Sequence, residues 1–594
     1  MIRSFKLTTE TVLYAVILGA AVLLRLSGLG ELPLSDGEAT EALQAAAATQ
    51  AGSPFWNPEP SAAPSAAYRA WTRLIFQFGA ASDFGARILP VAAGTGIVLT
   101  PLLIRRRFGR GTSLAMALLL ALSPALVTTS RTAGGDAIAA LALLLAIGLL
   151  TGGERLSANS KPLLWAALAL GVAFASGSAT MNAFLGLGLG TLIFLLMSRE
   201  REALANSIRG FLPSASLQTA LFFIGGFLAA GAGFGLAPTG LEGFSEAVSA
   251  WAGGWARPAS FHAVTILSIL PIYEPLTLVA GLLGAVSALR AKDKAGSWAA
   301  SWALGAWALA LIYPGRRPED LIWALVPLCY LGARAVIQLA ERFLDGGRWT
   351  WALLLSSVLL VLLSFSYFQL VEFAQSAERQ AGESVFDPRL LQSLGALLLA
   401  VMAVFLFGLG WEWRSASHAG AWTAGLALML IAITTGWRMN RPNHGMLRQE
   451  LWRRQAVAPG LDLVRETLHS FSAGQRVNLE PVRVAFADDP TPSLAWALRD
   501  AQPTSLDSPA GQSPPILVAR DDGALPGLAA DYIGQNLSIG EEWGWTGDLP
   551  PNFLAWLVRR DGPSVGDRWI LLVRSDLGWL TGSVPGDVLA PPKE

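Results

Sequence analysis

The sequence predicts a polytopic α-helical membrane protein that ends in a small α/β domain. Of its 594 residues, 53% are hydrophobic and only 14% are charged. Apolar runs of membrane-spanning length recur from residue 11 to residue 437. After Trp437 the sequence turns polar, and short apolar stretches bounded by turn residues follow. The first two observations predict the membrane part, and the third predicts the domain after it.

Apolar windows of roughly 17 to 25 residues predict about thirteen membrane-spanning helices. We expect them near 9–28, 86–104, 112–130, 135–151, 162–177, 181–197, 216–236, 263–288, 296–313, 320–340, 349–371, 390–409 and 419–437. The stretch GLGLGTL (186–192) predicts close packing of two helices, because glycine lets their backbones approach.

Basic residues are concentrated in alternate loops between these windows. With Arg3 and Lys6, they are Arg105, Arg106, Arg107, Arg110, Arg155, Lys161, Arg199, Arg201, Arg209, Arg290, Lys292, Lys294, Arg342 and Arg348. Because Lys and Arg are retained on the cytoplasmic side, we expect a cytoplasmic N-terminus and a plasma-membrane location. The loop 30–85, the turn SRTAGGD, the loop 237–262, the turn YPGRRPED and everything after residue 438 then lie on the outer face.

Beyond residue 437 the pattern predicts an extracytoplasmic α/β domain, so we divide the chain into 1–437 and 438–594. We expect strands at VRVAFA (482–487), PILVAR (515–520) and RWILLVR (568–574), and helices at PSLAWALRD (492–500) and PNFLAWLVRR (551–560).

Several classes of partner and site are disfavoured. A formal net charge of zero gives no sign of a nucleic-acid partner. The single cysteine, Cys329, has no partner for a disulfide, and the four histidines lack metal-ligand spacing. No cofactor is therefore indicated, although a divalent cation bound by the carboxylate of Asp36 stays open.

Two acids follow the first apolar window in the stretch ELPLSDGEATEALQAAA (31–47). Ser35 and Glu38 have the spacing of a capping box, in which the serine bonds the N3 amide and the acid bonds the N-cap amide. Acids in a first helical turn also favour the positive end of the helix dipole, which accounts for both as helix-starting residues. The cap nevertheless leaves Asp36 unused at the membrane surface, where a carboxylate is placed to accept a proton from a hydroxyl.

Five further residues are candidates for substrate binding. Arg131 and Asp136 belong to the turn SRTAGGD, and Arg316 and Arg317 to the turn YPGRRPED. Glu274 lies within an apolar stretch, where an acid is costly and a functional role is favoured. Each has a plain alternative: Arg131 snorkels to the interface, the arginine pair forms a solvated turn with neighbouring acids, and Glu274 pairs with an arginine in the bundle.

The order of these motifs resembles a known family. Arg25-Leu26, the acidic pair, FWNPEPSAAP, SDFGARILPVAAG and RRRFGR are similar to the start of a glycosyltransferase-C protein. More narrowly, they resemble the dolichyl-phosphate-mannose protein mannosyltransferase and aminoarabinose transferase families. ALLLALSPALVTTSRTAGGDAIAALALLL, PIYEPLTLV, GRRPEDLIWALVPLCYLGARA and DPTPSLAWALRD resemble later parts of these proteins. The similarity extends over essentially the whole chain.

The resemblance implies an inverting transferase that moves a sugar from a polyprenyl-phosphate donor to a lipid, glycan or protein acceptor on the outer face. Asp36 would be the general base, and Glu38 would position the acceptor or tune Asp36. Arg131 and Asp136 would complete the cavity. The guanidinium groups of Arg316 and Arg317 would bind the leaving lipid phosphate.

The chain also departs from the family pattern. Gly37 separates the two acids, Ser61-Ala62-Ala63-Pro64 replaces a His-Gly-Pro-like element, and SGSATMN (176–182) lacks a lysine. Each departure removes a polar group that would bind sugar or phosphate. Two other functions therefore stay open: a catalytically silent relative that binds glycolipid or organises envelope proteins, and a flippase-associated membrane component.

Overall fold

A computed structural model of the chain describes residues 8–47, 61, 63–79, 81–152, 160–198, 216–344, 349–379, 387–441, 449–457, 460–474, 483–499, 501–506, 510–521 and 527–577. Most of the predicted stretch FWNPEPSAAP lies outside these residues, as do Arg3, Lys6, Arg155, Arg199, Arg201, Arg209 and Arg348. The chain forms two compact units. The helical unit comprises Met1–Gly30, Pro60–Arg453 and Trp545–Gly562, and the sheet unit comprises Glu31–Glu59, Arg454–Gly544 and Pro563–Glu594.

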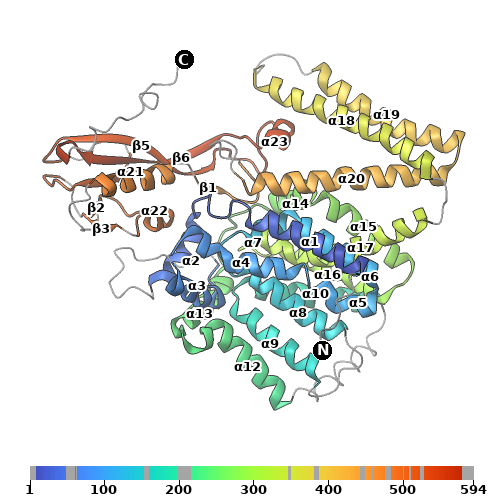
Figure 1. The fold of residues 1–594 in the computed structure, drawn as a ribbon, viewed down its shortest axis with the longest axis horizontal. Helices are drawn as coiled ribbons and strands as arrows, with labels where there is room; N and C mark the ends of the chain where they lie inside the picture. Colours follow the sequence, from blue (N-terminus) through green and yellow to red (C-terminus); the bar gives the residue numbers. More distant parts are fainter. Residues whose placement is uncertain are drawn as a thin grey trace. The chain divides into compact units, whose positions relative to one another are not determined.

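The helical unit is built almost wholly from α-helices (Figure 1). They are α1 (Thr9–Leu26), α3 (Ala66–Phe78), α4 (Asp83–Ile97), α5 (Pro101–Phe108), α6 (Arg110–Leu122), α7 (Pro124–Ser130), α8 (Asp136–Gly152), α9 (Lys161–Ala175), α10 (Ala179–Ser198), α12 (Leu217–Gly231), α13 (Glu242–Gly253), α14 (Ala263–Tyr273), α15 (Pro275–Arg290), α16 (Lys294–Ile312), α17 (Ile322–Leu344), α18 (Trp349–Arg379), α19 (Pro388–Gly410), α20 (Trp413–Met439) and α23 (Phe553–Arg559). Short 3-10 helices are η2 (Gly233–Gly235), η3 (Pro238–Leu241) and η4 (Pro318–Leu321).

The lengths and composition of these helices suit a lipid bilayer. In the part of the chain that the structure describes, eight helices are long and apolar enough to cross a membrane, or up to ten if two bent pairs each count as one span. The predicted spans near 135–151, 162–177 and 216–236 correspond to the shorter apolar helices α8, α9 and α12. The predicted membrane class is therefore confirmed, while the count of thirteen spans stays a prediction.

Both bent pairs break at a proline. The α6–α7 pair bends by 62° and the α14–α15 pair by 91°. Pro124 and Pro275 each begin the second helix, and a proline disfavours helical backbone in the residue before it. Ser123 accordingly has ψ 115°, and Glu274 has φ −121° and ψ 41°. The bends expose backbone amides inside the bundle that side chains must satisfy.

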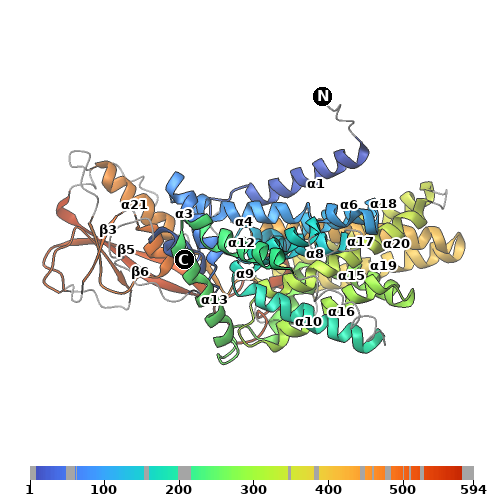
Figure 2. The same ribbon diagram turned by 90° about the horizontal axis from the view of Figure 1, so that it is seen from below.

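Helices α10 and α16 pack closely through glycine (Figure 2). A Cβ atom added at Gly190 would lie 2.4 Å from Cα of Trp302, and one added at Gly305 would lie 2.4 Å from the backbone nitrogen of Gly190. A side chain at either position would force the helices apart. The predicted role of the glycine-rich stretch is therefore confirmed.

The sheet unit contains a mixed sheet of six strands in the order β1-β5-β6-β4-β2-β3. The strands are β1 (Gln455–Val457), β2 (Arg483–Phe486), β3 (Gln502–Ser505), β4 (Ile516–Arg520), β5 (Tyr532–Trp543) and β6 (Ser564–Arg574), and the helices are α2 (Asp36–Ala47), α21 (Gly460–Gly474), α22 (Pro492–Ala497) and the 3-10 helix η5 (Ser575–Leu577). Strand β2 runs parallel to β3 and β4, and the other pairs are antiparallel.

Alternation along the central strands divides the core between the two faces of this sheet. Val484 and Phe486 of β2 pack with buried residues of α21 and α22 on one face, while Ala485 belongs to a separate cluster with Leu517 and Leu572. Helix α21 lies across the first face (Figure 2). Because consecutive residues of a strand point to opposite faces of the sheet, the strand register determines the face on which each polar side chain lies.

The predicted elements of the C-terminal part are largely present. The expected strands at 482–487, 515–520 and 568–574 correspond to β2, β4 and β6, and the expected helix at 492–500 corresponds to α22. The expected helix at 551–560 is α23, but it belongs to the helical unit. The segment 31–59, in contrast, groups with the sheet.

Candidate functional site

Asp136 and Arg317 form the central ion pair of a polar cluster in the helical unit. Arg317 donates from Nη2 to Oδ1 of Asp136 at 3.1 Å and from Nη1 to Oδ2 at 3.2 Å. Their side chains are only 20% and 18% exposed. Such a bidentate ion pair fixes the orientation of both side chains, because the planar guanidinium and the carboxylate form two parallel hydrogen bonds. The structure therefore brings together the turns SRTAGGD and YPGRRPED, which the sequence placed on one membrane face.

Asp320 joins two further loops to this cluster. Its carboxylate accepts hydrogen bonds from Nδ2 of Asn182 and from the backbone amide of Arg317, both at 2.9 Å. Oδ1 of Asn182 in turn accepts from Nε1 of Trp251 at 2.9 Å. These contacts connect residues 176–182 and 237–262 with the two turns, so one network holds four connecting segments at the same end of the bundle.

Arg316 and Arg317 differ in how many carboxylates and hydrogen-bond acceptors their guanidinium groups already contact. Burial alone would lower the pKa of Arg317, but the carboxylates of Asp136, Asp320 and Glu319 raise it above its usual range. Arg317 is therefore a permanent cation within an acidic setting. Arg316 donates from Nη1 to the carbonyl of Leu311, and its Nε has no acceptor among the described residues. Of the two, Arg316 has more capacity for a further anion.

Arg131 is committed to main-chain groups. It is 5% exposed and donates to the carbonyls of Arg25 and Ser27 at 2.8 Å, of Gly28 at 3.2 Å and of Asn440 at 3.3 Å. The last carbonyls of a helix lack partners within it, so Arg131 caps the end of α1. The burial of its guanidinium among carbonyls favours this capping role over the alternative that Arg131 snorkels to the membrane interface.

Glu274 occupies the sharper of the two bends. It is 1% exposed and accepts from the hydroxyls of Ser123 and Thr277, the latter at 2.8 Å, and from the backbone amide of Ala125 at 2.9 Å. It thereby satisfies an amide freed where α7 begins. The partners of Glu274 are hydroxyls and an amide, which favours a structural role over the alternative of a pair with arginine.

Asp36 and Glu38 begin α2 in the sheet unit. Oε2 of Glu38 accepts from the backbone amide of Ser35 at 3.1 Å, as the capping box predicts. The Ser35 hydroxyl donates to the same oxygen at 2.9 Å. The carboxylate half of the box is confirmed, and the serine acts as a donor to it. Glu38 is 2% exposed, so its carboxylate is part of the helix start.

Asp36 contacts a segment far along the chain. Its Oδ1 accepts from the backbone amide of Ser493 at 3.0 Å, near the start of α22. Thr491 caps that short helix through its hydroxyl, which accepts from the amide of Leu494 at 3.4 Å. The hydrogen bond from Ser493 fixes the orientation of the Asp36 carboxylate while using only one of its oxygens.

Asp36 also lines a cavity of about 400 Å³ within the sheet unit. The other polar lining residues include Thr491, Arg520, Glu541, Glu542 and Asp567. Strand β5 shifts its register between Ser538 and Gly540, beside this cavity. Such a bulge re-aims side chains at a strand edge and is common next to binding sites.

Aromatic and charged groups hold one wall of this cavity. Arg520 lies over the ring of Trp569 at 5.4 Å, and Nε1 of Trp569 donates to Oδ2 of Asp567 at 2.9 Å. This arrangement offers both hydrogen-bond acceptors and a cation to a polar ligand. Across the described ranges, no group of three or more His, Cys, Asp and Glu side chains is placed to hold a metal ion.

Comparisons with known proteins show which solved structures this architecture is similar to. ArnT from Cupriavidus metallidurans, solved with undecaprenyl phosphate, matches with a TM-score of 0.52 at 14% identity, covering 95% of this chain and 98% of that chain. Its apo state matches with a TM-score of 0.53 at 14% identity, covering 96% and 99%. This chain has a glycosyltransferase-C fold. Archaeal AglB from Archaeoglobus fulgidus also matches, at 12% identity and a TM-score of 0.42, covering 86% and 69%.

The sequence comparisons match a smaller part of the chain than the structural comparisons do. Residues 62–224 match the model of the family described as dolichyl-phosphate-mannose-protein mannosyltransferase. No curated protein matches the sequence. The matched range includes Arg131 and Asp136 but ends before Arg316 and begins after Asp36. The resemblance inferred from the motifs is thus confirmed, and the roles of the individual residues stay predictions.

Sequence reasoning did not single out several polar residues that the structure places in the cluster or beside the cavity. Asn182 and Asp320 stand at helix starts within largely apolar surroundings, where polar residues are costly. The cost of a polar residue in an apolar stretch could have marked both Asn182 and Asp320 as candidates for the site. Arg520 and Glu541 carried no such signal, because Arg520 only ends a buried strand and Glu541 lies in a strand with partly exposed residues, where charged side chains are ordinary.

Proposed function

We propose that this chain is a membrane glycosyltransferase that moves a sugar from a polyprenyl-phosphate donor to an acceptor on the outer face of the plasma membrane, with inversion. The glycosyltransferase-C fold and the family-model match over residues 62–224 support this class. The ArnT structure was solved with undecaprenyl phosphate, a lipid of the kind we assign to the donor. The acceptor is a lipid, a glycan or a protein.

The placement of Asp36 carries the proposal. Its carboxylate is oriented by the amide of Ser493 and lines a polar cavity of about 400 Å³. An oriented carboxylate beside a space for a polar ligand is what general-base catalysis requires. Asn at this position would keep an oxygen for the Ser493 amide but would be a far weaker base. Geometry and basicity at Asp36 are thus separable by mutation.

The proposed reaction is a single displacement. The acceptor hydroxyl oxygen attacks the anomeric carbon as Asp36 takes its proton, and the bond between that carbon and the phosphate oxygen breaks. The bonding electron pair leaves with the polyprenyl phosphate. Attack from the face opposite the leaving group inverts the configuration at the anomeric carbon, as in inverting glycosidases, where a carboxylate base activates the nucleophile.

The departing lipid phosphate needs a cation near it, because negative charge builds up there. We assign this role first to Arg316, whose hydrogen bonding is less complete than that of Arg317. Asp136 then serves by holding Arg317. The substrate roles of Arg131 and Glu38 rest on the resemblance alone, and that of Glu274 rests on the cost of an acid in an apolar stretch. The contacts of all three favour structural roles.

The proposal includes the topology inferred from the basic loops. Thirteen spans require the eight long helices, both bent pairs and the three shorter apolar helices all to cross the membrane. The N-terminus is then cytoplasmic, and the residues after 438 are extracytoplasmic. A cysteine introduced in the Asp136 turn should then react with an impermeant thiol reagent added outside, while one introduced at Arg106 should not.

A specific observation also favours the silent-relative function. Glu38 is used by the cap of α2, and Asp36 receives the Ser493 amide, so both acids contribute to structure. A relative without catalysis would keep these contacts and bind a glycolipid without turning it over.

The test is transfer by purified wild-type protein in lipid vesicles from a panel of radiolabelled polyprenyl-phosphate sugars to an envelope lipid and glycan extract. NMR of the isolated product reports the anomeric configuration. Inverted product supports the proposal, and retained configuration contradicts it. Binding of a donor without any transfer identifies the silent relative.

A further inference from the structure

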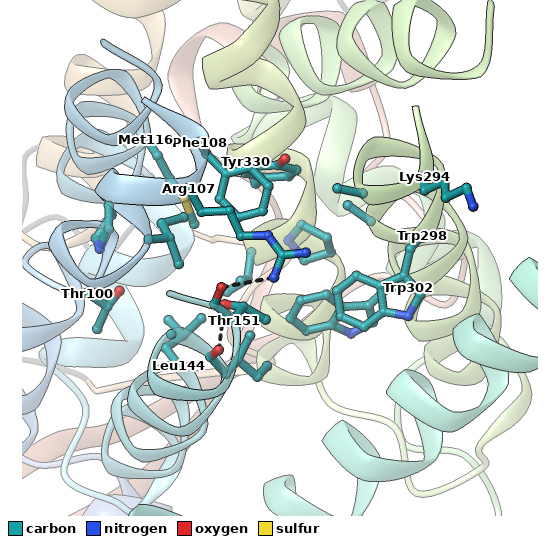
Figure 3. A pocket seen from close by; sticks show the side chains of 18 of the residues that line it. Thr100, Arg107, Phe108, Met116, Leu144, Thr151, Lys294, Trp298, Trp302 and Tyr330 are labelled. Carbon is teal, nitrogen blue, oxygen red and sulfur yellow. Dashed lines mark hydrogen bonds between the residues drawn. The ribbon is translucent and has the colours of Figure 1, made fainter. Parts of the chain in front are cut away.

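A second cavity lies within the helical unit, at the ends of α8 and α16 that are remote from the Asp136–Arg317 pair. Its volume is about 390 Å³, and α5, α6, α8, α10, α16 and α17 line it (Figure 3). The cavity is lined by the last turns of α8 and the first turns of α16, whereas Asp136 begins α8 and Arg317 follows α16. The proposed site and this cavity therefore have no lining residue in common.

The body of this cavity suits hydrocarbon. Its walls are mostly aliphatic and aromatic, with the rings of Phe108 and Tyr330 edge to face at 5.0 Å and those of Trp298 and Trp302 at 5.5 Å. Trp302 is only 4% exposed, and its Nε1 has no hydrogen-bond acceptor within the described residues. An unpaired buried donor beside an open space indicates room for a ligand that carries an acceptor.

The charges on the lining have a single sign. Arg107 and Lys294 line the cavity, and no acid does. Nη1 of Arg107 donates to the carbonyl of Thr151 at 3.0 Å, and Figure 3 shows its guanidinium pointing in among the aromatic side chains. This bond uses one of the five donors of a guanidinium. Asp293, which precedes Lys294 in the sequence, accepts from Arg334 and from the amide of Gly296.

We propose that this cavity binds an anionic phospholipid of the surrounding bilayer. The phosphate contacts Arg107, Lys294 adds positive charge to the lining, and an acyl chain lies along the apolar wall toward Trp302. Basic pockets between transmembrane helices select anionic headgroups in this way. Arg107 near the end of α5 and Lys294 at the start of α16 belong to the basic segments that the charge distribution assigns to the cytoplasmic face, where anionic lipids are available. The inference shares the topology of the proposed function but does not depend on transferase activity.

The test uses full-length protein in detergent and native mass spectrometry to measure binding of phosphatidylglycerol. Phosphatidylcholine with the same acyl chains tests the headgroup, and undecaprenyl phosphate tests whether the occupant is a donor-type lipid. The double variant Arg107→Gln/Lys294→Gln removes both charges. Arg106→Gln is the matched control, because Arg106 is on the same helix and exposed but does not line the cavity.

We expect phosphatidylglycerol to bind at least tenfold more tightly than phosphatidylcholine, and the double variant to lose that preference while Arg106→Gln keeps it. A second variant, Ala295→Phe, fills the cavity and should lower phosphatidylglycerol binding with the charges intact. Equal binding of the two phospholipids, an unchanged preference in the double variant, or binding of undecaprenyl phosphate alone would each overturn the inference.

Discussion

Asp136 and Arg317 are 181 residues apart in the sequence, yet their side chains meet through two parallel hydrogen bonds of 3.1 and 3.2 Å. Asp136 begins α8 and Arg317 precedes η4, so the pair ties one connecting turn to another. Its side chains are mostly buried, and loss of either partner leaves the other charge without its main counterpart. The pair therefore holds the two turns together at this end of the bundle.

Breaking the Asp136–Arg317 ion pair should destabilise the helical unit. Asp136→Asn and Arg317→Gln are each expected to lower the free energy of unfolding by about 2 kcal/mol, the range for hydrogen bonds to charged groups. The double variant should lose less than the sum of the two, because neither charge is then left alone. Thermal unfolding in detergent measures the cycle. Additive losses would show that the two side chains do not interact.

Glu274 should prove to be a structural acid. Glu274→Leu leaves the Ala125 amide and two hydroxyls without an acceptor, at a cost of about 3 kcal/mol. Glu274→Gln keeps an acceptor oxygen and should cost less. Glu242→Gln, at an exposed position of α13, is the control. Thermal stability and donor binding per folded molecule are measured together, and a Gln variant of normal stability that no longer binds donor would assign Glu274 to the substrate.

The glycine contact between α10 and α16 leads to a packing prediction. Gly190→Leu places its Cβ against the backbone of Trp302 and should destabilise the protein by about 3 kcal/mol or abolish its expression. Gly188→Leu, on the same helix, has no atom within 4 Å of the added Cβ and should be tolerated. Comparing the melting temperatures of the two variants checks this contact. Equal melting temperatures would rule out the close packing.

The two arginines should separate stability from donor binding. Arg316→Gln is expected to raise the KM for a polyprenyl-phosphate donor by about tenfold, equivalent to about 1.4 kcal/mol, with little change in melting temperature. Arg317→Gln should act mainly on stability, because its guanidinium is held by Asp136. Donor titrations at low and high salt measure the difference. A normal KM in the Arg316 variant would leave the phosphate without its assigned cation.

The sequence was most informative where local chemistry determines the structure. The apolar windows predicted the helices because a backbone in lipid must satisfy its own hydrogen bonds. Pro124 and Pro275 mark both bends, although the windows 112–130 and 263–288 read as single spans. The capping box at Ser35 and Glu38 was also predictable, since all of its atoms lie within four residues.

Contacts between distant segments were beyond such reasoning. Asp36 meets the amide of Ser493 across 457 residues, and no spacing in the sequence encodes that contact. The grouping of residues 545–562 with the helices has the same cause. Trp556 donates from Nε1 to the carbonyl of Gln449 at 2.7 Å, a tertiary contact that overrides the local alternation of strands and helices.

The measurement that tests the central claim most directly compares Asp36→Asn with wild type in lipid vesicles, following sugar transfer and thermal stability together. Glu31→Gln, an exposed neighbour, is the matched control. Asn keeps an oxygen for the Ser493 amide, so stability should hold, while loss of the base should slow transfer by about 10² to 10⁴-fold. Transfer within twofold of wild type at unchanged stability would contradict the account and remove Asp36 from the chemistry.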